Sequence, residues 1–162
     1  MAETSAGILL YRRAPGLEVF IAHMGGPFWS RKDAAAWSIP KGVYTDGEEP
    51  LAAAIREFTE EIGTPPPAVE YRLLGRFRQP SGKVVTVFAA EADFAVETIA
   101  GNTFTLEWPP RSGRMQDFPE IDDARWFPLD VAREKLVKGQ LPVLDTLDQH
   151  LRRPPSLAEW TP

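Results

Sequence analysis

The stretch from Gly42 to Thr64 reads GVYTDGEEPLAAAIREFTEEIGT and decides the fold. Its apolar residues recur at intervals of three and four, which predicts one apolar stripe along a helix. Glu57, Glu60 and Glu61 stand three and four positions apart, so they share a different face of that helix. Carboxylates this concentrated repel one another, and a divalent cation removes the repulsion. The stretch therefore predicts a two-faced helix with a metal site, and the metal points to phosphate chemistry.

The ends of this helix are marked by residues with special backbone preferences. We expect it to begin between Gly47 and Pro50, with Thr45 or Asp46 as its cap, since proline suits the first helical turn. It ends at Gly63, because glycine readily adopts the left-handed conformation that stops helices, and three prolines follow. The apolar stripe consists of Leu51, Ala54, Ile55, Phe58 and Ile62.

The rest of the chain alternates strand patterns with turns and closes with helical patterns. The first two expected strands form a hairpin around a Pro-Gly turn. Residues 25–37 and 109–120 are expected to be loops. The sequence predicts an α/β (α+β) fold in which residues 1–153 form a single domain and residues 154–162 a Pro-rich tail. The expected strands are 6–11, 17–23, 69–77, 83–92, 103–108 and 125–127, and the expected closing helices are 129–138 and 142–152.

Composition and charge exclude several classes of protein. The 162 residues carry a net charge of -5, which argues against a general nucleic-acid binder. There are no cysteines, so thiolate metal sites and Cys nucleophiles are excluded. The first basic residues follow a short apolar run, the wrong order for a secretory signal, and stretches such as 84–90 are too short to span a bilayer. We therefore expect a cytoplasmic protein with no membrane partner; a homodimer is compatible with the sequence.

The Gly42–Thr64 stretch resembles the Nudix box of the Nudix hydrolases. That pattern is Gly, five residues, Glu, seven residues, Arg-Glu, an aliphatic, any residue, Glu-Glu, any residue, Gly and an aliphatic. Phe58 fills an aliphatic position, while Thr64 departs from the pattern at a packing position. The resemblance implies an α-β-α sandwich with a mixed sheet and the box helix. All seven fixed letters are present, as Gly42, Glu48, Arg56, Glu57, Glu60, Glu61 and Gly63.

The resemblance also implies a Mg²⁺ site, with Mn²⁺ as the alternative ion. Mg²⁺ prefers hard oxygen ligands and keeps waters beside substrate phosphates. Arg56 and Glu48 are expected to orient ligands without binding the ion themselves, and Arg56 stands four residues before Glu60, within reach of a bidentate contact. The expected ligands are the carboxylates of Glu57, Glu60 and Glu61 and a backbone carbonyl near Gly42.

One further carboxylate is expected from outside the helix. Glu120 lies in segment 118–126, which looks like the stretch that donates a catalytic Glu in diadenosine-polyphosphate hydrolases. It is expected to bind metal or to accept the proton of the attacking water, a role that a Glu of the box could also fill; Glu107 is the weaker candidate. The expected catalytic residues are Glu57, Glu60, Glu61, Arg56 and Glu120.

Six residues are predicted to contact the substrate, each with a structural alternative. Lys41 offers a point charge to phosphate at the entry to the turn. Phe28 and Trp29 lie in a Gly-rich loop and could stack on a nucleobase, whereas Trp37 suits the core equally well. A histidine that ends a strand is more often structural, and a lysine at a strand start is more often solvated. The six are Lys41, Phe28, Trp29, Trp37, Lys83 and His23.

The leading hypothesis is a Mg²⁺-dependent pyrophosphohydrolase that cleaves a nucleoside diphosphate-linked substrate by attack of water on phosphorus. Segments 37–42 and 125–129 look like the diadenosine-tetraphosphate hydrolase branch, which favours a dinucleoside polyphosphate. The longer loop 25–33 looks more like bacterial predicted nucleoside-triphosphate pyrophosphohydrolases. The alternatives are an RNA 5′-pyrophosphohydrolase and a non-hydrolytic nucleotide-binding sensor or interaction module on the same fold.

Overall fold

A mixed sheet forms the centre of the molecule. The computed structural model describes residues 3–13 and 15–152, and in these ranges seven strands join one sheet. They are β1 (Thr4–Arg12), β2 (Glu18–Met24), β3 (Trp37–Ser38), β4 (Lys41–Val43), β5 (Arg72–Arg78), β6 (Val84–Glu91) and β9 (Ile121–Pro128). Five follow the order β3-β2-β1-β6-β5, while β4 pairs with β1 and β9 with β2. Strands β1 and β6 run parallel and the other pairs antiparallel, so the predicted mixed sheet is confirmed.

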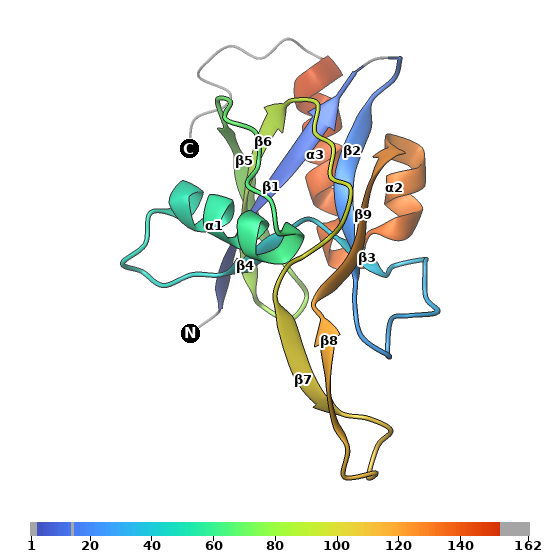
Figure 1. Cartoon of the computed structure of the whole chain (residues 1–162). Helices are drawn as coiled ribbons and strands as arrows, with labels where there is room; N and C mark the ends of the chain where they lie inside the picture. Colours follow the sequence, from blue (N-terminus) through green and yellow to red (C-terminus); the bar gives the residue numbers. More distant parts are fainter. Residues whose placement is uncertain (1–2, 14, 153–162) are drawn as a thin grey trace.

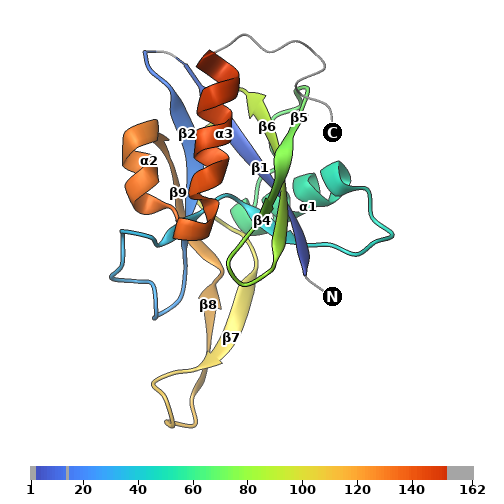
Figure 2. The same cartoon turned by 180° about the vertical axis from the view of Figure 1, so that it is seen from behind.

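Helices cover both faces of this sheet. Helix α1 (Pro50–Ile62) lies on one face, and α2 (Leu129–Lys135) and α3 (Leu141–Arg152) lie on the other (Figures 1 and 2). A short 3₁₀ helix, η1 (Lys138–Gln140), leads into α3. The arrangement is the predicted α-β-α sandwich. No helix in the described ranges combines the length and the apolar character needed to cross a bilayer.

Strand β1 explains why the sheet is covered twice. Successive strand residues point to opposite faces, and here both faces are buried. Ile8 and Leu10 join the core beneath α1, where they meet Phe58. Leu9 joins the opposite core with Leu144 of α3. The consecutive apolar residues of β1, from Ile8 to Tyr11, thus separate two hydrophobic cores, and one of these cores holds the box helix.

The predicted cap of α1 is wrong, while its predicted end is confirmed. The N-cap is Glu49, whose carboxylate accepts hydrogen bonds from the backbone amides two and three residues later, at 3.2 and 2.8 Å. The helix begins directly at Pro50, so neither Thr45 nor Asp46 is close enough in sequence to cap it. At the other end Gly63 takes the left-handed conformation, with φ 89°.

The loop predicted at residues 109–120 instead contains a strand. Strands β7 (Thr103–Glu107) and β8 (Met115–Pro119) pair as a separate antiparallel hairpin. Four of the five β8 residues are exposed, so its sequence shows no alternation of apolar and polar residues. β9 begins at residue 121, earlier than predicted, whereas β5 begins at residue 72, later than predicted, and α2 ends at residue 135, before its predicted end. The predicted tail 154–162 lies outside the described residues.

This hairpin leaves the body as an arm. Figures 1 and 2 show β7 and β8 extending away from the sheet, beyond the end of α1, with their connecting turn at the far end. Both ends of the arm return to the body close together, since Thr103 pairs with Pro119. The arm therefore starts and finishes beside Glu120, one of the predicted site residues.

Candidate metal and phosphate site

Arg56 draws three carboxylates together on the exposed face of α1. Its Nη1 donates to Glu57 Oε1 at 2.9 Å and to Glu60 Oε1 at 3.2 Å. Its Nη2 donates to Glu48 Oε2 at 3.0 Å. Glu48 precedes the helix, so one guanidinium ties the loop to the helix face. The orienting role expected of Arg56 and Glu48 stays a prediction, and these contacts agree with it.

Glu61 contacts the backbone of strand β4. Its Oε1 accepts a hydrogen bond of 2.7 Å from the backbone amide of Lys41, in β4. Burial raises the pKa of the Glu61 carboxyl to about 8; the hydrogen bond and charge of Lys41 oppose the rise, and the charges of Glu120 and Glu57 add to it. Lys41 thus compensates the negative charge of Glu61 only in part.

Glu57 lies directly against Gly42. A Cβ at residue 42 would lie 1.9 Å from Glu57 Oε2, so only a glycine permits this approach. The Glu57 side chain is 14% exposed. Burial raises its pKa, the charge of Glu60 adds to the rise, and Arg56 opposes it. The turn and the helix therefore meet through a carboxylate rather than through apolar packing.

Glu120 lies between β8 and β9, and its charge contributes to the raised pKa of both Glu57 and Glu61. The structure thus brings this residue toward the box carboxylates across a long stretch of chain. Glu107, the weaker candidate, lies in β7 at the outer part of the arm, where its Oε1 accepts a hydrogen bond from the amide of Arg111 at 3.0 Å. Its place in the fold favours a structural role.

A backbone bridge, residues Ala100–Asn102, holds Glu120 to the helix. The amide of Asn102 donates to the carbonyl of Glu60 at 2.8 Å, and the amide of Ala100 donates to that of Ile62 at 3.1 Å. The amide of Glu120 in turn donates to the carbonyl of Asn102 at 2.9 Å. Carbonyls of the last helical turn lack partners within the helix, and this bridge supplies them. The same bonds fix Glu120 relative to α1.

The donor set fits a hard divalent cation. Glu57 and Glu61 offer carboxylate oxygens, both have a raised pKa, and the charge of Glu120 acts on both. A divalent cation there would favour the ionised forms. In residues 3–13 and 15–152 no three acidic or histidine side chains lie close enough together to bind one metal ion as they stand. Two of the expected ligands, Glu57 and Glu60, instead accept hydrogen bonds from Arg56. Mg²⁺ usually takes only one or two carboxylates together with waters and phosphates, which suits this arrangement.

Two predicted substrate residues, His23 and Trp37, are buried away from the carboxylates. His23 Nδ1 lies 2.6 Å from Asp122 Oδ1 and its Nε2 lies 2.7 Å from the carbonyl of Lys32. Both ring nitrogens thus have an oxygen partner within the fold. Trp37 is 5% exposed, belongs to the core beneath α2 and α3, and donates its indole N–H to Asp33. These contacts favour structural roles for both residues.

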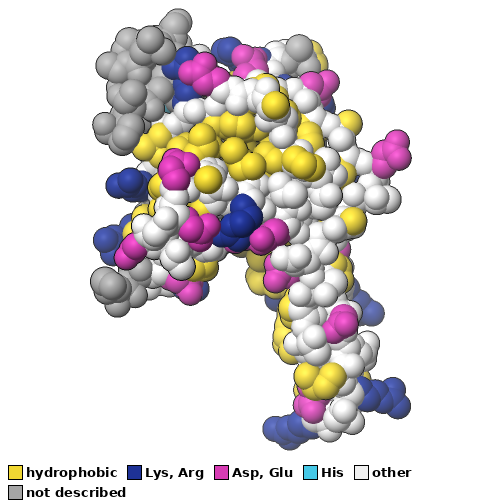
Figure 3. All heavy atoms as spheres, turned by 60° about the vertical axis from the view of Figure 1, so that its left-hand side comes forward, with side chains coloured by type: hydrophobic (Ala, Val, Ile, Leu, Met, Phe, Trp, Pro, Cys, Tyr) yellow, Lys and Arg dark blue, Asp and Glu magenta, His cyan; other side chains and the backbone are white. Residues whose placement is uncertain are grey.

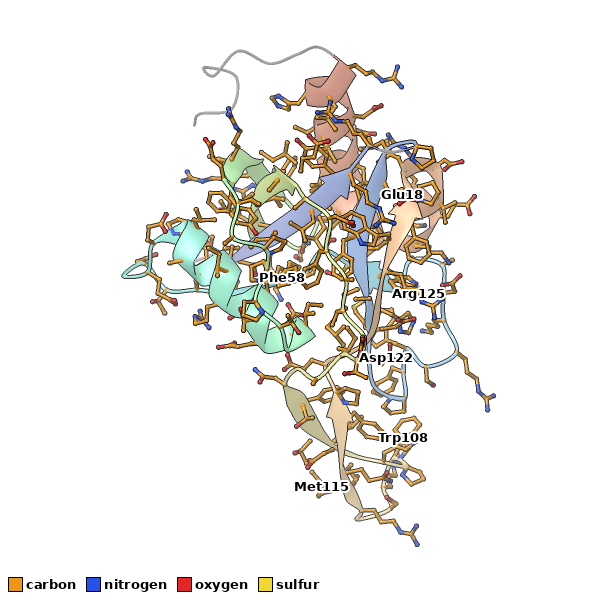
Figure 4. All side chains as sticks on the ribbon, turned by 45° about the horizontal axis from the view of Figure 1, so that its top comes forward. Glu18, Phe58, Trp108, Met115, Asp122 and Arg125 are labelled. Atoms are coloured by element: carbon orange, nitrogen blue, oxygen red, sulfur yellow. The ribbon has the colours of Figure 1, made fainter. Side chains whose placement is uncertain are left out.

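A cavity of about 590 Å³ opens beside this pair and is lined by His23, Trp37, Asp122 and Arg125 among others. Figure 4 shows Asp122 near the point where the arm joins the body and Arg125 farther along β9. None of the expected metal ligands lines this cavity. Of its lining residues, Trp37 belongs to the core on the face of the sheet opposite α1.

The other predicted substrate residues are scattered. Lys41 meets the carboxylate site through its backbone amide and its charge. Phe28 is 59% exposed and packs edge-on against Trp108 of the arm, with ring centres 5.4 Å apart. Trp29 packs against the core beneath α2 and α3. Lys83 forms an ion pair of 3.1 Å with Glu3 at the start of the sheet.

Sequence reasoning missed Asn102 and Trp108. Asn102 acts through its backbone, and no residue type is required for that, so its sequence held no signal. The sequence around Trp108 did carry a signal. Pro-Pro-Arg-Ser-Gly directly after an aromatic residue is typical of an exposed turn, and a large ring that cannot join the core there indicates an interaction surface.

The sequence of this chain is similar to a known protein family and to several named proteins. Residues 1–147 match the family described as NUDIX domain. A nucleoside triphosphate pyrophosphatase/Nudix hydrolase fusion protein of Bifidobacterium longum is 34% identical over 113 residues, which cover 65% of this chain and 23% of that protein. An RNA pyrophosphohydrolase of Hahella chejuensis is 29% identical over 113 residues, which cover 63% of this chain and 66% of that protein. The chain thus spans about a quarter of the first relative and just under two thirds of the second.

Solved structures share the fold at low identity. A C. elegans Ap4A hydrolase in a binary complex has a TM-score of 0.61 and 19% identity, covering 91% of this chain and 98% of that one. The NUDIX domain of Shewanella oneidensis NrtR, complexed with ADP ribose, has a TM-score of 0.62 and 17% identity, covering 93% and 89%. Similarity at this level establishes the architecture alone.

Proposed function

This chain belongs to the NUDIX family, as predicted, and we propose that it hydrolyses a phosphoanhydride bond of a nucleoside diphosphate-linked substrate with the help of Mg²⁺. One observation carries the proposal. The carboxylate of Glu57 lies against Gly42 and that of Glu61 accepts the Lys41 amide hydrogen, so both meet strand β4. Both have raised pKa values, and the charge of Glu120 acts on both. Acidic groups gathered this way without a cation disfavour their own ionisation, and a divalent metal reverses that effect.

The chain's own residues would divide the work. Glu57 and Glu61 would hold the ion, with Glu60 joining as its contact with Arg56 allows. When bound, Mg²⁺ neutralises phosphate charge and makes a water more acidic. Glu120 would accept the proton of the attacking water, and Lys41 would offer a positive charge to the phosphates. Attack of the water on phosphorus breaks the anhydride bond and releases two phosphorylated products.

The leading substrates are a dinucleoside polyphosphate, such as diadenosine tetraphosphate, and a nucleoside triphosphate. The segments before the box and in β9 that resemble the diadenosine-tetraphosphate hydrolase branch support the first, and the shared architecture with a C. elegans Ap4A hydrolase agrees with it. The longer loop at residues 25–33, which looks more like bacterial predicted nucleoside-triphosphate pyrophosphohydrolases, supports the second.

An RNA 5′ end is a second candidate, and specific observations favour it. Two relatives, of 29% and 27% identity, are named RNA pyrophosphohydrolase, and the second alignment covers 74% of this chain and 79% of that protein. The arm adds an exposed surface beyond the carboxylate site. A nucleotide sensor without turnover is disfavoured because every fixed letter of the box is present.

A substrate panel tests the proposal directly. The chain is incubated with Mg²⁺ or Mn²⁺ and each candidate, and the products are separated by chromatography. ATP plus AMP from diadenosine tetraphosphate selects the first substrate, nucleoside monophosphate plus pyrophosphate selects the triphosphate, and a 5′-monophosphate RNA selects the third. Tight metal-dependent nucleotide binding with no turnover over hours would instead identify a sensor.

Glu61→Gln tests the site itself. The Gln side chain keeps an oxygen that can accept the hydrogen bond from the Lys41 backbone amide, but it has no negative charge. We therefore expect kcat to fall by about 10²-fold or more. Glu97→Gln makes the same change at an exposed position outside the site and serves as the control. Hydrolysis by Glu61→Gln as fast as by the control would contradict the assignment of the site.

A further inference from the structure

The arm carries its tip well away from the carboxylate site. β7 and β8 pair over five residues each, from Thr103 opposite Pro119 to Glu107 opposite Met115. At about 3.4 Å per residue, the paired region alone extends roughly 14 Å from Glu120, and the connecting turn lies farther out. Figure 4 shows Trp108 and Met115 near the outer end. A group bound at the carboxylates could therefore touch the tip only through a long chain.

The arm is supported as one unit with the loop that follows β2. The amide of Gly25 donates to the carbonyl of Glu120 at 2.8 Å. A Cβ at Gly26 would lie 2.7 Å from the ring of Phe104, so the loop backbone lies flat on the arm. Farther out, Phe28 packs edge-on against Trp108. A two-stranded hairpin alone is marginally stable in water, and these contacts hold it in place.

The tip combines exposed aromatic surface with unpaired positive charge. Phe28 is 59% exposed, and Trp108 lies beside it. Arg111 and Arg114 occupy the turn, and neither guanidinium forms an ion pair with a described residue, although the whole chain has a net charge of -5. Figure 3 shows Lys or Arg side chains at the far end of the arm. An acidic protein that keeps cations beside exposed rings at one extremity presents a local surface for a polyanion with unstacked bases.

We propose that this tip, formed by Phe28, Trp108, Arg111 and Arg114, binds the chain of a single-stranded RNA whose 5′ phosphates lie at the carboxylate site. The rings stack on bases of any sequence, and the arginines contact backbone phosphates. The separation of at least about 14 Å suits a polymer rather than a mononucleotide. The placement of the 5′ end rests on the proposed function; the binding surface does not.

A second copy of the chain fits the tip less well. A stable protein interface buries roughly 1,200–2,000 Å² in total, and a hairpin turn with two arginines offers little apolar area toward that. Charge alone would permit such a contact, since the arginines could face the acidic body of another copy. Self-association through the arm is therefore a distinct outcome of the test below.

The test measures binding of a 3′-fluorescein-labelled, 5′-hydroxyl single-stranded RNA by fluorescence anisotropy across a salt series. This RNA has no phosphoanhydride bond, so the result is independent of hydrolysis. We expect Trp108→Ala to weaken binding at least about fivefold, and Trp108→Phe to restore it, because stacking needs a ring. We expect Arg111→Ala/Arg114→Ala to reduce the slope of log K against log salt by about 1.4, since each phosphate contact in a single strand contributes about 0.7.

The matched control is Arg76→Ala/Arg78→Ala, which removes two exposed arginines of β5 on the main sheet and should leave the slope unchanged. Circular dichroism verifies that each variant folds. Equal losses in both double variants, or no RNA binding by the wild type, would overturn the proposal. A wild-type dimer in sedimentation that the arm variants reduce to a monomer would identify a second copy as the occupant. RNA binding through the arm by a chain that hydrolyses nothing would end the proposed function and leave this inference standing.

Discussion

At the scale of single residues, the site depends on one close approach. Gly42 and Glu57 are separated by a loop and about two helical turns, yet the carboxylate of Glu57 lies against the backbone of Gly42. The Nudix box prescribes both letters, and the structure supplies the reason why they occur together: any side chain at residue 42 would displace the carboxylate.

Gly42→Ala should therefore weaken metal binding without unfolding the chain. The new methyl would lie 1.9 Å from Glu57 Oε2 and force that side chain away. We expect divalent-metal affinity to fall on the order of 10- to 100-fold, as when a partner that orients a ligand is removed. Isothermal titration calorimetry with Mn²⁺ measures it. Gly47→Ala, in the loop that follows β4 and with nothing within 4 Å of its Cβ, is the control; equal affinities of the two variants would refute the steric account.

At the scale of elements, hydrogen bonds at both ends of α1 and along its length fix the position of the helix. Its N-terminus is capped by Glu49, and Glu61 binds the β4 backbone. The Ala100–Asn102 bridge closes its last turn. Arg56 completes the set on the exposed face, where it reaches Glu48 before the helix. A helix held this way presents its carboxylates in a reproducible geometry, which catalysis by positioning requires.

Arg56→Lys tests whether this geometry needs a planar fork. An ammonium is a point charge and cannot reach Glu48, Glu57 and Glu60 together as the guanidinium does. We expect kcat/KM to fall about 10- to 100-fold. The melting temperature should hardly change, because exposed ion pairs contribute little stability. Arg133→Lys, at an ion pair between α2 and Asp145, is the control; a similar loss there would show that the effect is general.

At the scale of the whole molecule, two cores hold the sandwich together, and a tyrosine at its edge links stability to pH. Burial raises the pKa of Tyr71 to about 12, and its hydroxyl donates to the carbonyl of Pro67. The pKa of Tyr11 is raised as well, first by burial and then by Glu91. Both shifts favour the neutral phenol in the folded state.

Stability should accordingly fall at alkaline pH. Because the folded pKa of Tyr71 lies above the unfolded value of about 10, its contribution is complete below pH 10 and is lost as the pH rises through 12. Urea unfolding at pH 8, 10, 11 and 12 measures the decline. Tyr71→Phe loses a hydrogen bond at every pH but should show a shallower decline above pH 10. An identical decline in both proteins would exclude Tyr71 as a cause.

Much of the fold was predictable because it depends on the spacing of residues that are close in sequence. The helix stripe, the left-handed glycine at its end and the apolar strands β1 and β6 all follow from residue spacing. Strand β8 was missed because its residues are mostly exposed and its pattern arises only from pairing with β7. The roles of His23 and Trp37 were open in the sequence, since burial depends on what the chain folds over them.

The sequence by itself determined the family, the two-faced helix and the set of acidic residues, because these depend on neighbours within a few turns. The tertiary structure decided which carboxylates meet. Glu61 reaches the Lys41 amide across 20 residues, and Glu120 approaches through the Asn102 bridge. The arm pairs a predicted strand, β7, with a segment that the sequence shows only as a loop, β8. Contacts between distant parts of a chain depend on how strands pair and helices pack, and no local spacing of residues contains that information.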